Sequence, residues 1–265
     1  MDMSVFVAST AAVLVLMLCV WIISVRIKDA SIVDVVWGLG FVLIVWVSRL
    51  AVGGEWILRH EFVLFATTAW GLRLAGYLAW RNLGKGEDYR YRLMRKKHGD
   101  RFAIVSLRTV FLTQAVLMLL VSIPAQIAQM NFSRDIDHQG VDGFLVVGLV
   151  IWAIGMFFET VGDIQLAKFK GNPDNAGKVM NRGLWRFTRH PNYFGDFCVW
   201  WGIWVMAVSS PIAVVGIIGP MLMSFLLMRF SGVPMLEHSI AKRRPGYDEY
   251  RKNTSSFFPR PPKRS

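Results

Sequence analysis

Residues 4–25 read SVFVASTAAVLVLMLCVWIISV and contain no charged side chain. A bilayer core of about 30 Å is crossed by roughly 20 consecutive apolar residues in a helix. Backbone amides inside lipid have no water to bond, so they must be hydrogen-bonded within the segment itself, which a helix achieves. The stretch is too long for a signal-peptide core and has no basic residues before it. It therefore predicts a retained membrane span.

Six more apolar stretches follow along the chain. They are 30–50, 62–80, 110–128, 143–161, 194–209 and 211–230. The stretch at 194–209 is short, and the Ser-Ser-Pro sequence at 209–211 predicts a tight turn into the last one. We therefore expect an all-α, polytopic membrane protein with about seven transmembrane helices, forming a single domain over 1–265.

The composition agrees with a membrane protein. Hydrophobic residues make up 54% of the chain, although its net charge is +12. A high net positive charge is typical of nucleic-acid binding only when the cations cover a soluble surface. Here the cations lie between apolar runs, so we expect no nucleic-acid partner. Cys19 and Cys198 lie inside apolar stretches, and the histidines show no ligand spacing. We therefore expect neither disulfides nor a metal site.

Lysine and arginine gather in alternate loops. The loops after the first, third and fifth expected spans are basic, as is the tail, whereas the remaining loops carry few cations. Cytoplasmic loops of membrane proteins are enriched in Lys and Arg. We therefore expect the amino terminus outside and the carboxy-terminal tail in the cytoplasm, in a bacterial inner membrane or an endoplasmic reticulum.

Several ionisable residues lie within the expected spans, where charge is costly and so often has a function. They are Asp34, well inside the second span; Arg73 and Tyr77, on one face of the third; Glu159 and Asp163, which share a face at the end of the fifth; and Arg229, at the end of the seventh. The alternative is that they form structural ion pairs between helices, such as one between Asp34 and Arg73.

The densest group of functional side chains lies at 181–196, NRGLWRFTRHPNYFGD. It brings cations, amides, aromatic rings and a carboxylate to the start of a helix, where the dipole and the free N–H groups favour anions. Thr188 or Asn192 could cap that helix. The positive-inside rule explains the arginines but not the rest of the pattern. The candidates for cofactor binding here are Arg189, His190, Asn192, Tyr193 and Asp196.

This stretch and three others resemble one protein family. The elements are RHPNYFGD at 189–196 with GLW ahead of it, DVVWG at 34–38, EDYRY at 87–91, and YDEY at 247–250 followed by TSSFFP. Together they resemble the steroid 5-alpha-reductase-like membrane proteins, and within these the DUF1295 branch. The resemblance covers about residues 30–260, with the elements in the expected order.

The resemblance implies seven helices, NADPH bound by cytosolic loops and the last three helices, and hydride transfer to an activated C=C bond. The substrate would be a lipophilic small molecule that enters from the bilayer, and the cofactor-binding half would cover about 143–265. The matching cofactor positions are Glu159, Asp163, Lys170, Lys178, Asn192, Asp196 and Arg229, while Arg73 and Tyr77 match an Arg-xxx-Tyr pair on the third helix. The sequence has no Gly-rich nucleotide-binding loop, so loop residues would hold the cofactor.

The chain departs from the family pattern at several cofactor positions. Family members have Asn where Glu159 stands and Glu where Asp196 stands. They have arginines at the positions of Lys170 and Lys178. Lysine keeps the charge that a phosphate needs but loses the bidentate fork, which bears on the choice between NADPH and NADH.

A second departure concerns the catalytic positions. The resemblance implies a Glu on the second helix and a Tyr on the third that polarise an enone carbonyl. Asp34 is a stand-in for the Glu, because apolar surroundings would keep it protonated as a donor. The Tyr position is Trp70, whose indole can donate a hydrogen bond but not a proton. Asp34 and Tyr77 are therefore the catalytic candidates.

Two other functions stay open. A membrane methyltransferase of the isoprenylcysteine carboxyl methyltransferase type would use Glu237, Tyr247 and Tyr250 to bind S-adenosylmethionine. The elements at 34–38 and 87–91, and a Leu-Glu-His sequence where such enzymes have a Glu-Glu pair, argue against it. A transporter or scaffold is the other alternative, although transporters usually show repeated halves and none is visible here.

Overall fold

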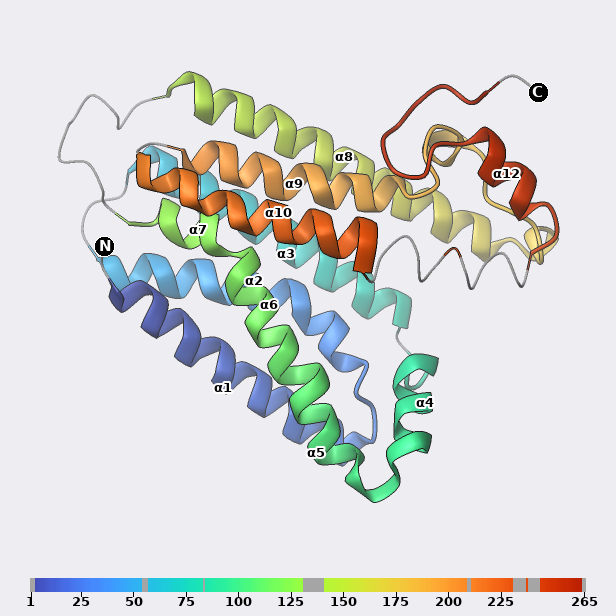
Figure 1. Ribbon diagram of the computed structural model, residues 1–265, viewed down its shortest axis with the longest axis horizontal. Coiled ribbons are helices and arrows are strands. Elements are labelled where there is room, and N and C mark those ends of the chain that lie inside the picture. The colour runs from blue at the N-terminus through green and yellow to red at the C-terminus, as the bar shows by residue number, and fades with distance from the viewer. Residues whose placement is uncertain are drawn as a thin grey trace. The chain divides into compact units, whose positions relative to one another are not determined.

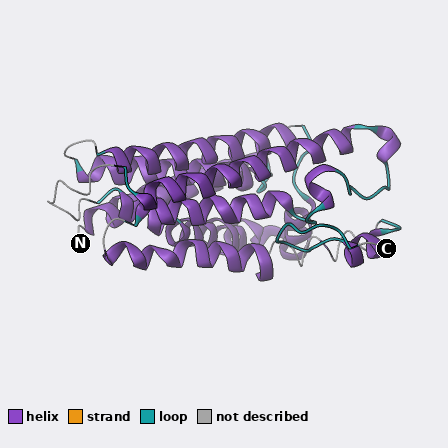
Figure 2. Ribbon diagram, turned by 90° about the horizontal axis from the view of Figure 1, so that it is seen from above, coloured by secondary structure: helices purple, strands orange, loops and turns teal. Residues whose placement is uncertain are grey.

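The structure is a computed structural model that describes residues 3–53, 57–82, 84–130, 141–208, 211–230, 237 and 244–263. Within these ranges the regular secondary structure is helical, apart from one isolated β-bridge between Thr188 and Ser255 (Figure 2). The expected all-α fold is therefore confirmed.

The helices follow the expected apolar stretches with shifted ends (Figure 1). The longer ones are α1 (Met3–Ile27), α2 (Ile32–Val52), α3 (Leu58–Asn82), α8 (Gly143–Gly171) and α9 (Pro191–Ala207). The shorter helical segments are α4 (Tyr89–His98), η1 (Gly99–Arg101), α5 (Phe102–Ser106), η2 (Leu107–Leu112), α6 (Thr113–Val121), α7 (Ile123–Ala128), η4 (Pro173–Asn175), η5 (Gly183–Arg186), η6 (Pro211–Ile217), α10 (Ile218–Phe225), η7 (Leu226–Phe230) and α12 (Tyr247–Asn253).

The chain is a multi-pass integral membrane protein. Six described helical stretches are long and apolar enough to cross a membrane: Met3–Ile27, Ile32–Val52, Leu58–Asn82, Tyr89–Val121, Gly143–Gly171 and Ile212–Phe230. The remaining expected span, 194–209, corresponds to α9, which has 17 residues. At a rise of 1.5 Å per residue, that helix is about 25 Å long and falls short of the bilayer core. The expected orientation stays a prediction.

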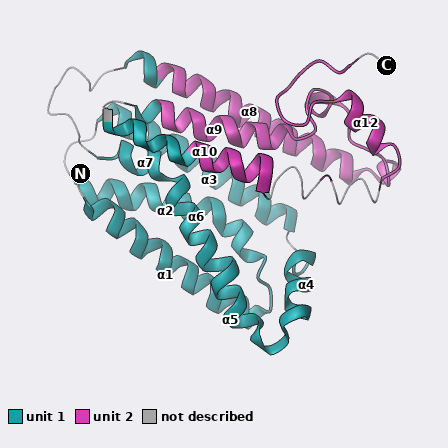
Figure 3. Ribbon diagram, in the orientation of Figure 1, with its two compact units in different colours: residues 1–145, 206–219 teal, residues 146–205, 220–265 magenta. Residues whose placement is uncertain are grey.

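The chain divides into two compact units (Figure 3). Unit 1 comprises Met1–Leu145 and Met206–Gly219, and unit 2 comprises Val146–Val205 and Pro220–Ser265. The cofactor-binding half expected at 143–265 overlaps unit 2, except that 143–145 and 206–219 belong to unit 1.

In unit 1, α2 packs between α1 and α3, and α6 crosses α1 and α2 (Figure 1). The contact between α2 and α3 is made by backbone, because Gly38 and Gly71 face one another and a Cβ on either would clash with the other's carbonyl oxygen. Aromatic rings fill the adjacent core, where Phe41 meets Trp70 edge-on at 5.4 Å. The glycine of the DVVWG element is therefore needed for close helix packing.

In unit 2, α8 and α9 also pack through glycines. A Cβ on Gly195 would lie 2.6 Å from the carbonyl oxygen of Gly155, and one on Gly202 would lie 2.8 Å from that of Gly148. The two glycine pairs are seven residues apart on each helix. A seven-residue repeat keeps one face of each helix against its partner, as in left-handed helix pairs.

Unit 1 also buries charge where α2 ends and α3 begins. Arg49 and Arg59 are 3% and 2% exposed. Arg59 forms an ion pair with Asp142 and donates to the carbonyl oxygen of Met206 at 2.6 Å, and Arg49 donates to that of Gly53 at 3.0 Å. Buried guanidinium groups require such partners, so these residues explain why the second and third spans are not cleanly apolar.

Candidate functional site

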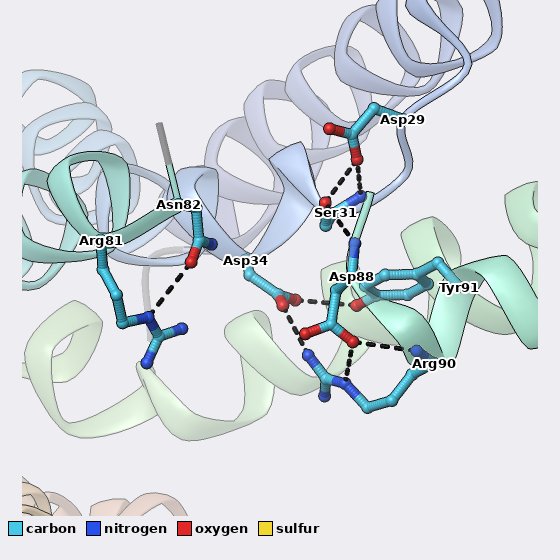
Figure 4. A network of polar contacts seen from close by, with 8 residues as sticks. All are labelled: Asp29, Ser31, Asp34, Arg81, Asn82, Asp88, Arg90 and Tyr91. Atoms are coloured by element: carbon cyan, nitrogen blue, oxygen red, sulfur yellow. Dashed lines mark hydrogen bonds and ion pairs between the residues drawn. The ribbon is translucent and has the colours of Figure 1, made fainter. Parts of the chain in front are cut away.

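A polar cluster in unit 1 surrounds the carboxylate of Asp34 (Figure 4). The hydroxyl of Tyr91 donates to one Asp34 oxygen at 2.8 Å, and the guanidinium of Arg90 donates to the other at 2.8 Å. Tyr91 is buried, whereas the Arg90 side chain is 45% exposed. The cluster is therefore buried on the tyrosine side and open to the surface on the arginine side.

The loop before α4 holds Arg90 in place. The Asp88 side chain caps α4 by accepting from the backbone N–H of Arg90 at 3.0 Å, and it accepts from the Arg90 Nε at 2.9 Å. Burial alone would raise the pKa of Asp88, but these hydrogen bonds and the Arg90 charge hold that pKa below its ordinary value. The Asp88 backbone N–H in turn donates to the Ser31 hydroxyl at 3.2 Å, which ties the loop to the start of α2.

Glu87 makes a second connection between the same two segments. It accepts from the backbone N–H of Ala30 at 2.9 Å and binds Arg95 through two hydrogen bonds of 2.7 and 3.0 Å. The Arg95 guanidinium lies 4.1 Å from the ring centroid of Phe102. The DVVWG and EDYRY elements, more than fifty residues apart in the sequence, therefore meet in space.

The position and the partner of Asp34 differ from the expectation. The sequence placed it well inside the second span, but α2 begins at Ile32, so Asp34 lies in its first turn. The expected span began at residue 30, but a turn at Asp29–Ser31 precedes α2. In this turn the Asp29 carboxylate accepts a hydrogen bond from the Ser31 backbone N–H at 2.8 Å. The structure pairs Asp34 with Arg90, whereas the sequence suggested Arg73 as a structural partner. Its role as an acid stays a prediction.

Tyr77 and Trp70 occupy other places on α3. The guanidinium carbons of Arg73 and Arg81 lie 5.5 and 5.8 Å from the Tyr77 ring centroid, in cation–π geometry. Trp70 is fully buried in the core of unit 1. The hydroxyl beside Asp34 instead belongs to Tyr91, which the sequence did not single out. The sequence did contain a signal for this pair, because the DVVWG element with Asp34 and the EDYRY element with Tyr91 resemble the same family.

The RHPNYFGD element in unit 2 is built around a buried ion pair. The Nε of Arg189 donates to a Glu237 carboxylate oxygen at 2.7 Å, and the His190 Nε2 lies 3.2 Å from the same oxygen. The His190 ring stacks on that of Tyr193 at 5.5 Å. Arg189 and His190 are 8% and 3% exposed. The structure thus brings together four of the residues expected to bind a cofactor.

Residues 254–263, here called the strap, bind the segment that precedes α9. The Arg189 side chain donates to the carbonyl oxygens of Arg251 and Thr254 at 2.8 and 2.7 Å, and its backbone N–H donates to that of Ser255 at 2.9 Å. The Thr188 hydroxyl donates to the Phe257 carbonyl oxygen at 2.7 Å. Arg189 therefore connects the strap to the start of α9.

Aromatic packing strengthens the same connection. The ring of Phe257 meets those of Phe194 and Phe197 edge-on at 6.3 and 5.6 Å. The Tyr250 hydroxyl donates to the Trp185 carbonyl oxygen. The TSSFFP and RHPNYFGD elements are thus two sides of one packed region.

Charge lowers one pKa in this region and burial raises another. Burial alone would raise the pKa of Glu237, but the hydrogen bonds and charges of His190 and Arg189 hold that pKa below its ordinary value. Burial, with the nearby charge of Glu237, raises the pKa of Tyr247 to about 12. Glu237 is therefore ionised and Tyr247 neutral near neutral pH.

The remaining candidates of unit 2 lie on α8, on α9 and at their ends. Glu159 and Asp163 are buried on α8, and the Asn192 amide donates to Asp163 at 3.2 Å. Asp196 lies one turn after Asn192 on α9 and is partly exposed.

Three expected cofactor-binding cations lie on the surface of unit 2. Lys170 is exposed at the end of α8, Lys178 is exposed in the loop after it, and Arg229 is exposed in η7. The chemistry of this set suits phosphate groups, because each side chain carries a positive charge that solvent can reach.

A protein-family model described as a protein of unknown function (DUF1295) matches residues 20–254. Over 102 residues the chain is 34% identical to the probable O-methyltransferase ustE of Ustilaginoidea virens, covering 38% of this chain and 34% of that protein. Over 64 residues it is 34% identical to the steroid 5-alpha-reductase DET2 of Gossypium hirsutum, covering 24% and 25%.

A third relative is the nickel-cobalt-cadmium resistance protein NccN of Alcaligenes xylosoxydans xylosoxydans, 25% identical over 112 residues, with 42% of this chain and 50% of that protein covered. The chain thus spans between a quarter and a half of the length of these three relatives. No solved structure matches it.

Proposed function

The chain belongs to the DUF1295 family, and we propose that it is a membrane-embedded reductase. Its reaction would be the NADPH-dependent reduction of a C=C bond conjugated to a carbonyl, in a steroid-like or other lipid. Support comes from the family match and from the similarity to a steroid 5-alpha-reductase over a quarter of each chain. A substrate of this kind is soluble in the bilayer and would enter the protein from it.

The observation that carries this proposal is the pair formed by the phenol of Tyr91 and the carboxylate of Asp34, 2.8 Å apart. The reductase-like pattern implies an acid and a phenol that together polarise a carbonyl. Trp70 stands where the sequence pattern has that phenol, and it is buried in the core. Tyr91 supplies a phenol at Asp34 from α4 instead.

The expected chemistry follows from these positions. Hydride addition to the β-carbon places negative charge on the carbonyl oxygen, and a proton then completes the saturated product. Loss of one donor aimed at such an oxygen typically costs about 2.7–4 kcal/mol. The Tyr91 hydroxyl would turn from Asp34 toward that oxygen. Arg90, 2.8 Å from Asp34 and 5.4 Å from the Tyr91 ring centroid, would balance the charge left on the pair.

NADPH supplies the hydride when it is bound. The exposed cations Lys170, Lys178 and Arg229 fit its phosphates in charge, and Asn192 lies in the first turn of α9, at the positive end of the helix dipole. Lysine holds a phosphate as a point charge, without the fork that arginine offers. We therefore propose that Lys170, Lys178, Asn192 and Arg229 bind the cofactor.

A methyltransferase is the second candidate, and the similarity to a probable O-methyltransferase over 102 residues favours it. That function would require Glu237, Tyr247 and Tyr250 to bind S-adenosylmethionine. Here Glu237 binds Arg189, and the Tyr250 hydroxyl binds the Trp185 carbonyl oxygen, so both side chains already hold the segment that precedes α9. The geometry therefore favours the reductase.

Binding of NADPH and of S-adenosylmethionine to detergent-purified protein, compared by calorimetry, tests the choice. We expect NADPH to bind, and we expect Asn192→Ala and Arg229→Ala to weaken that binding. Binding of S-adenosylmethionine alone would replace the reductase with the methyltransferase. Binding of neither would favour a scaffold or transporter.

A second experiment tests the proton donor. Tyr91→Phe removes one oxygen from a buried side chain, so we expect turnover to fall about a hundredfold or more while NADPH binding is kept. Tyr77→Phe is the matched variant, since Tyr77 was the tyrosine predicted from the sequence. If Tyr77→Phe abolishes turnover and Tyr91→Phe does not, the assignment to Tyr91 is wrong.

A further inference from the structure

The surface of α4 that points away from Asp34 has an ordered pattern. Tyr89 and Leu93, one turn apart, are 48% and 61% exposed. At 100° per residue, exposed Arg92 and Lys96 lie on one side of this apolar pair and exposed Lys97 on the other. We call these five residues the outer face of α4. Its apolar centre with flanking cations is typical of helices that lie in a membrane interface.

The position of α4 in the chain places this face at an end of the membrane spans. The helix follows the span Leu58–Asn82 and forms the charged start of the stretch Tyr89–Val121, whose apolar part begins at Phe102. Gly99 ends α4 with a φ of 53°, a conformation that glycine adopts easily, and the chain changes direction between α4 and α5 (Figure 1). The expected topology puts this loop on the cytoplasmic side.

We propose that the outer face of α4 binds the headgroups of anionic phospholipids at the membrane surface. Leu93 and Tyr89 would enter the headgroup and acyl boundary, while Arg92, Lys96 and Lys97 would reach the phosphates, as long cationic side chains do at interfaces. A cytoplasmic loop needs only a surplus of cations to orient a membrane protein. It does not need them placed on both sides of an exposed apolar pair, and this arrangement is what favours lipid binding.

The opposite face of α4 carries the candidate site. Tyr91 is buried and bonds Asp34, and Arg95 on the same side bonds Glu87. A lipid held on the outer face would fix the helix that positions the Tyr91 hydroxyl. We therefore expect anionic lipid to raise turnover as well as to bind, a consequence that rests on the proposed function.

The binding experiment uses the full chain in detergent with added phosphatidylglycerol or phosphatidylcholine, and native mass spectrometry measures the lipid retained. The test variant is Arg92→Gln/Lys96→Gln/Lys97→Gln. Its matched control, Lys168→Gln/Arg182→Gln/Arg186→Gln, removes the same charge from exposed positions of unit 2. Each cation near an anionic surface changes binding about fivefold, so the loss of three should leave the test variant with roughly a hundredfold less phosphatidylglycerol. The control should resemble the wild type.

Three outcomes would overturn the proposal. Equal retention of both lipids by the wild type would show that headgroup charge is not recognised. An equal loss in the control would attribute the effect to net charge alone. Displacement of phosphatidylglycerol by inorganic phosphate would identify a site for free phosphate. Unchanged thermal unfolding of the test variant excludes misfolding as the cause of a loss.

Turnover is then compared in bilayers of phosphatidylcholine and of an equal mixture with phosphatidylglycerol. We expect the wild type to be faster in the mixture and the test variant to be insensitive to it. The retention assay needs no cofactor. Selective lipid binding without any turnover would therefore leave the lipid site standing and count against the reductase.

Discussion

Both units join distant segments of the chain through an arginine and a carboxylate, but in different surroundings. In unit 1 the Arg90 and Asp34 side chains are 45% and 19% exposed, whereas in unit 2 the Arg189 and Glu237 side chains are 8% and 14% exposed. Arg90 also binds Asp88 in the loop before α4, while Arg189 binds backbone carbonyl oxygens around the strap. The first pair can meet a ligand, and the second is occupied in holding the fold.

This difference shows that arginines within the family elements can have different surroundings and different partners. The energetic consequences differ as well. A half-exposed ion pair contributes little to stability, about 0–1 kcal/mol. A buried arginine that donates to a carboxylate and to backbone carbonyl oxygens is costly to remove, because those partners are left without a donor. Substitutions in the two units should therefore separate stability from turnover.

The largest expected effect is that of Arg189→Ala. Breaking a buried pair by removing one partner costs about 3–5 kcal/mol, and here carbonyl oxygens of Arg251 and Thr254 also lose their donor. We expect a large fall in the unfolding temperature, measured by scanning calorimetry in detergent. Arg186→Ala removes an exposed arginine of the same segment and should change little. Equal effects of the two variants would contradict the structural role of Arg189.

The second-largest effect is expected at the glycine contacts between helices, because such contacts stabilise both units. Gly195→Ala places a Cβ 2.6 Å from the Gly155 carbonyl oxygen, and Gly71→Ala places one 2.5 Å from that of Gly38. Overpacking of this kind costs about 1–3 kcal/mol. Gly76→Ala, on α3 with no atom within 4 Å of its Cβ, is the control and should be neutral or stabilising. The measurement is the urea midpoint in detergent.

Asp34→Asn should give the opposite balance, with little loss of stability and a large loss of turnover. The amide keeps the shape but loses the charge that pairs with Arg90, and it would no longer orient the Tyr91 hydroxyl in the same way. Turnover is followed by loss of nicotinamide absorbance with an enone. Asp100→Asn, an exposed aspartate near the end of α4, should leave turnover unchanged. Turnover that survives Asp34→Asn in folded protein would remove Asp34 from the site.

The smallest effect concerns pH and the pair in unit 2. The folded pKa of Glu237 lies below its ordinary value of 4.5, so ionised Glu237 stabilises the fold above that pH. The stabilisation is lost as pH falls through the lowered folded pKa. The difference in unfolding temperature between wild type and Glu237→Gln should therefore be constant above about pH 4.5 and shrink below it. Glu249→Gln, which removes an exposed carboxylate of α12, is the matched variant for this comparison.

The helical membrane fold could be predicted from the sequence, because the length and composition of apolar runs depend on local residues alone. The start of α2 could not. Its position is decided by the Asp29 carboxylate and by Glu87 and Asp88, which bind the preceding turn from a loop far along the chain. A hydropathy pattern contains no record of such partners.

The contacts within the candidate site could not be predicted from the sequence, and the roles of its residues stay predictions. The dense pattern around Arg189 and His190 does mark an organised region, but their partners lie more than forty residues later, in Glu237 and the strap. The sequence favoured Tyr77 over Tyr91, because Tyr77 lies inside a span, where polar groups are costly and often functional. The sequence indicated a link between Tyr91 and Asp34 only through the family resemblance, because both residues lie in elements that resemble the same family.

The strap also sets an order of events during synthesis. When the ribosome has made the segment around Arg189, neither Glu237 nor the carbonyl oxygens of Arg251 and Thr254 exist yet. The intervening helices must enter the membrane before this arginine finds its partners. Until then the Arg189 guanidinium and the rings of Phe194 and Phe197 lack the partners that the finished fold supplies. The contacts that hold the start of α9 therefore form only after translation has passed through the strap.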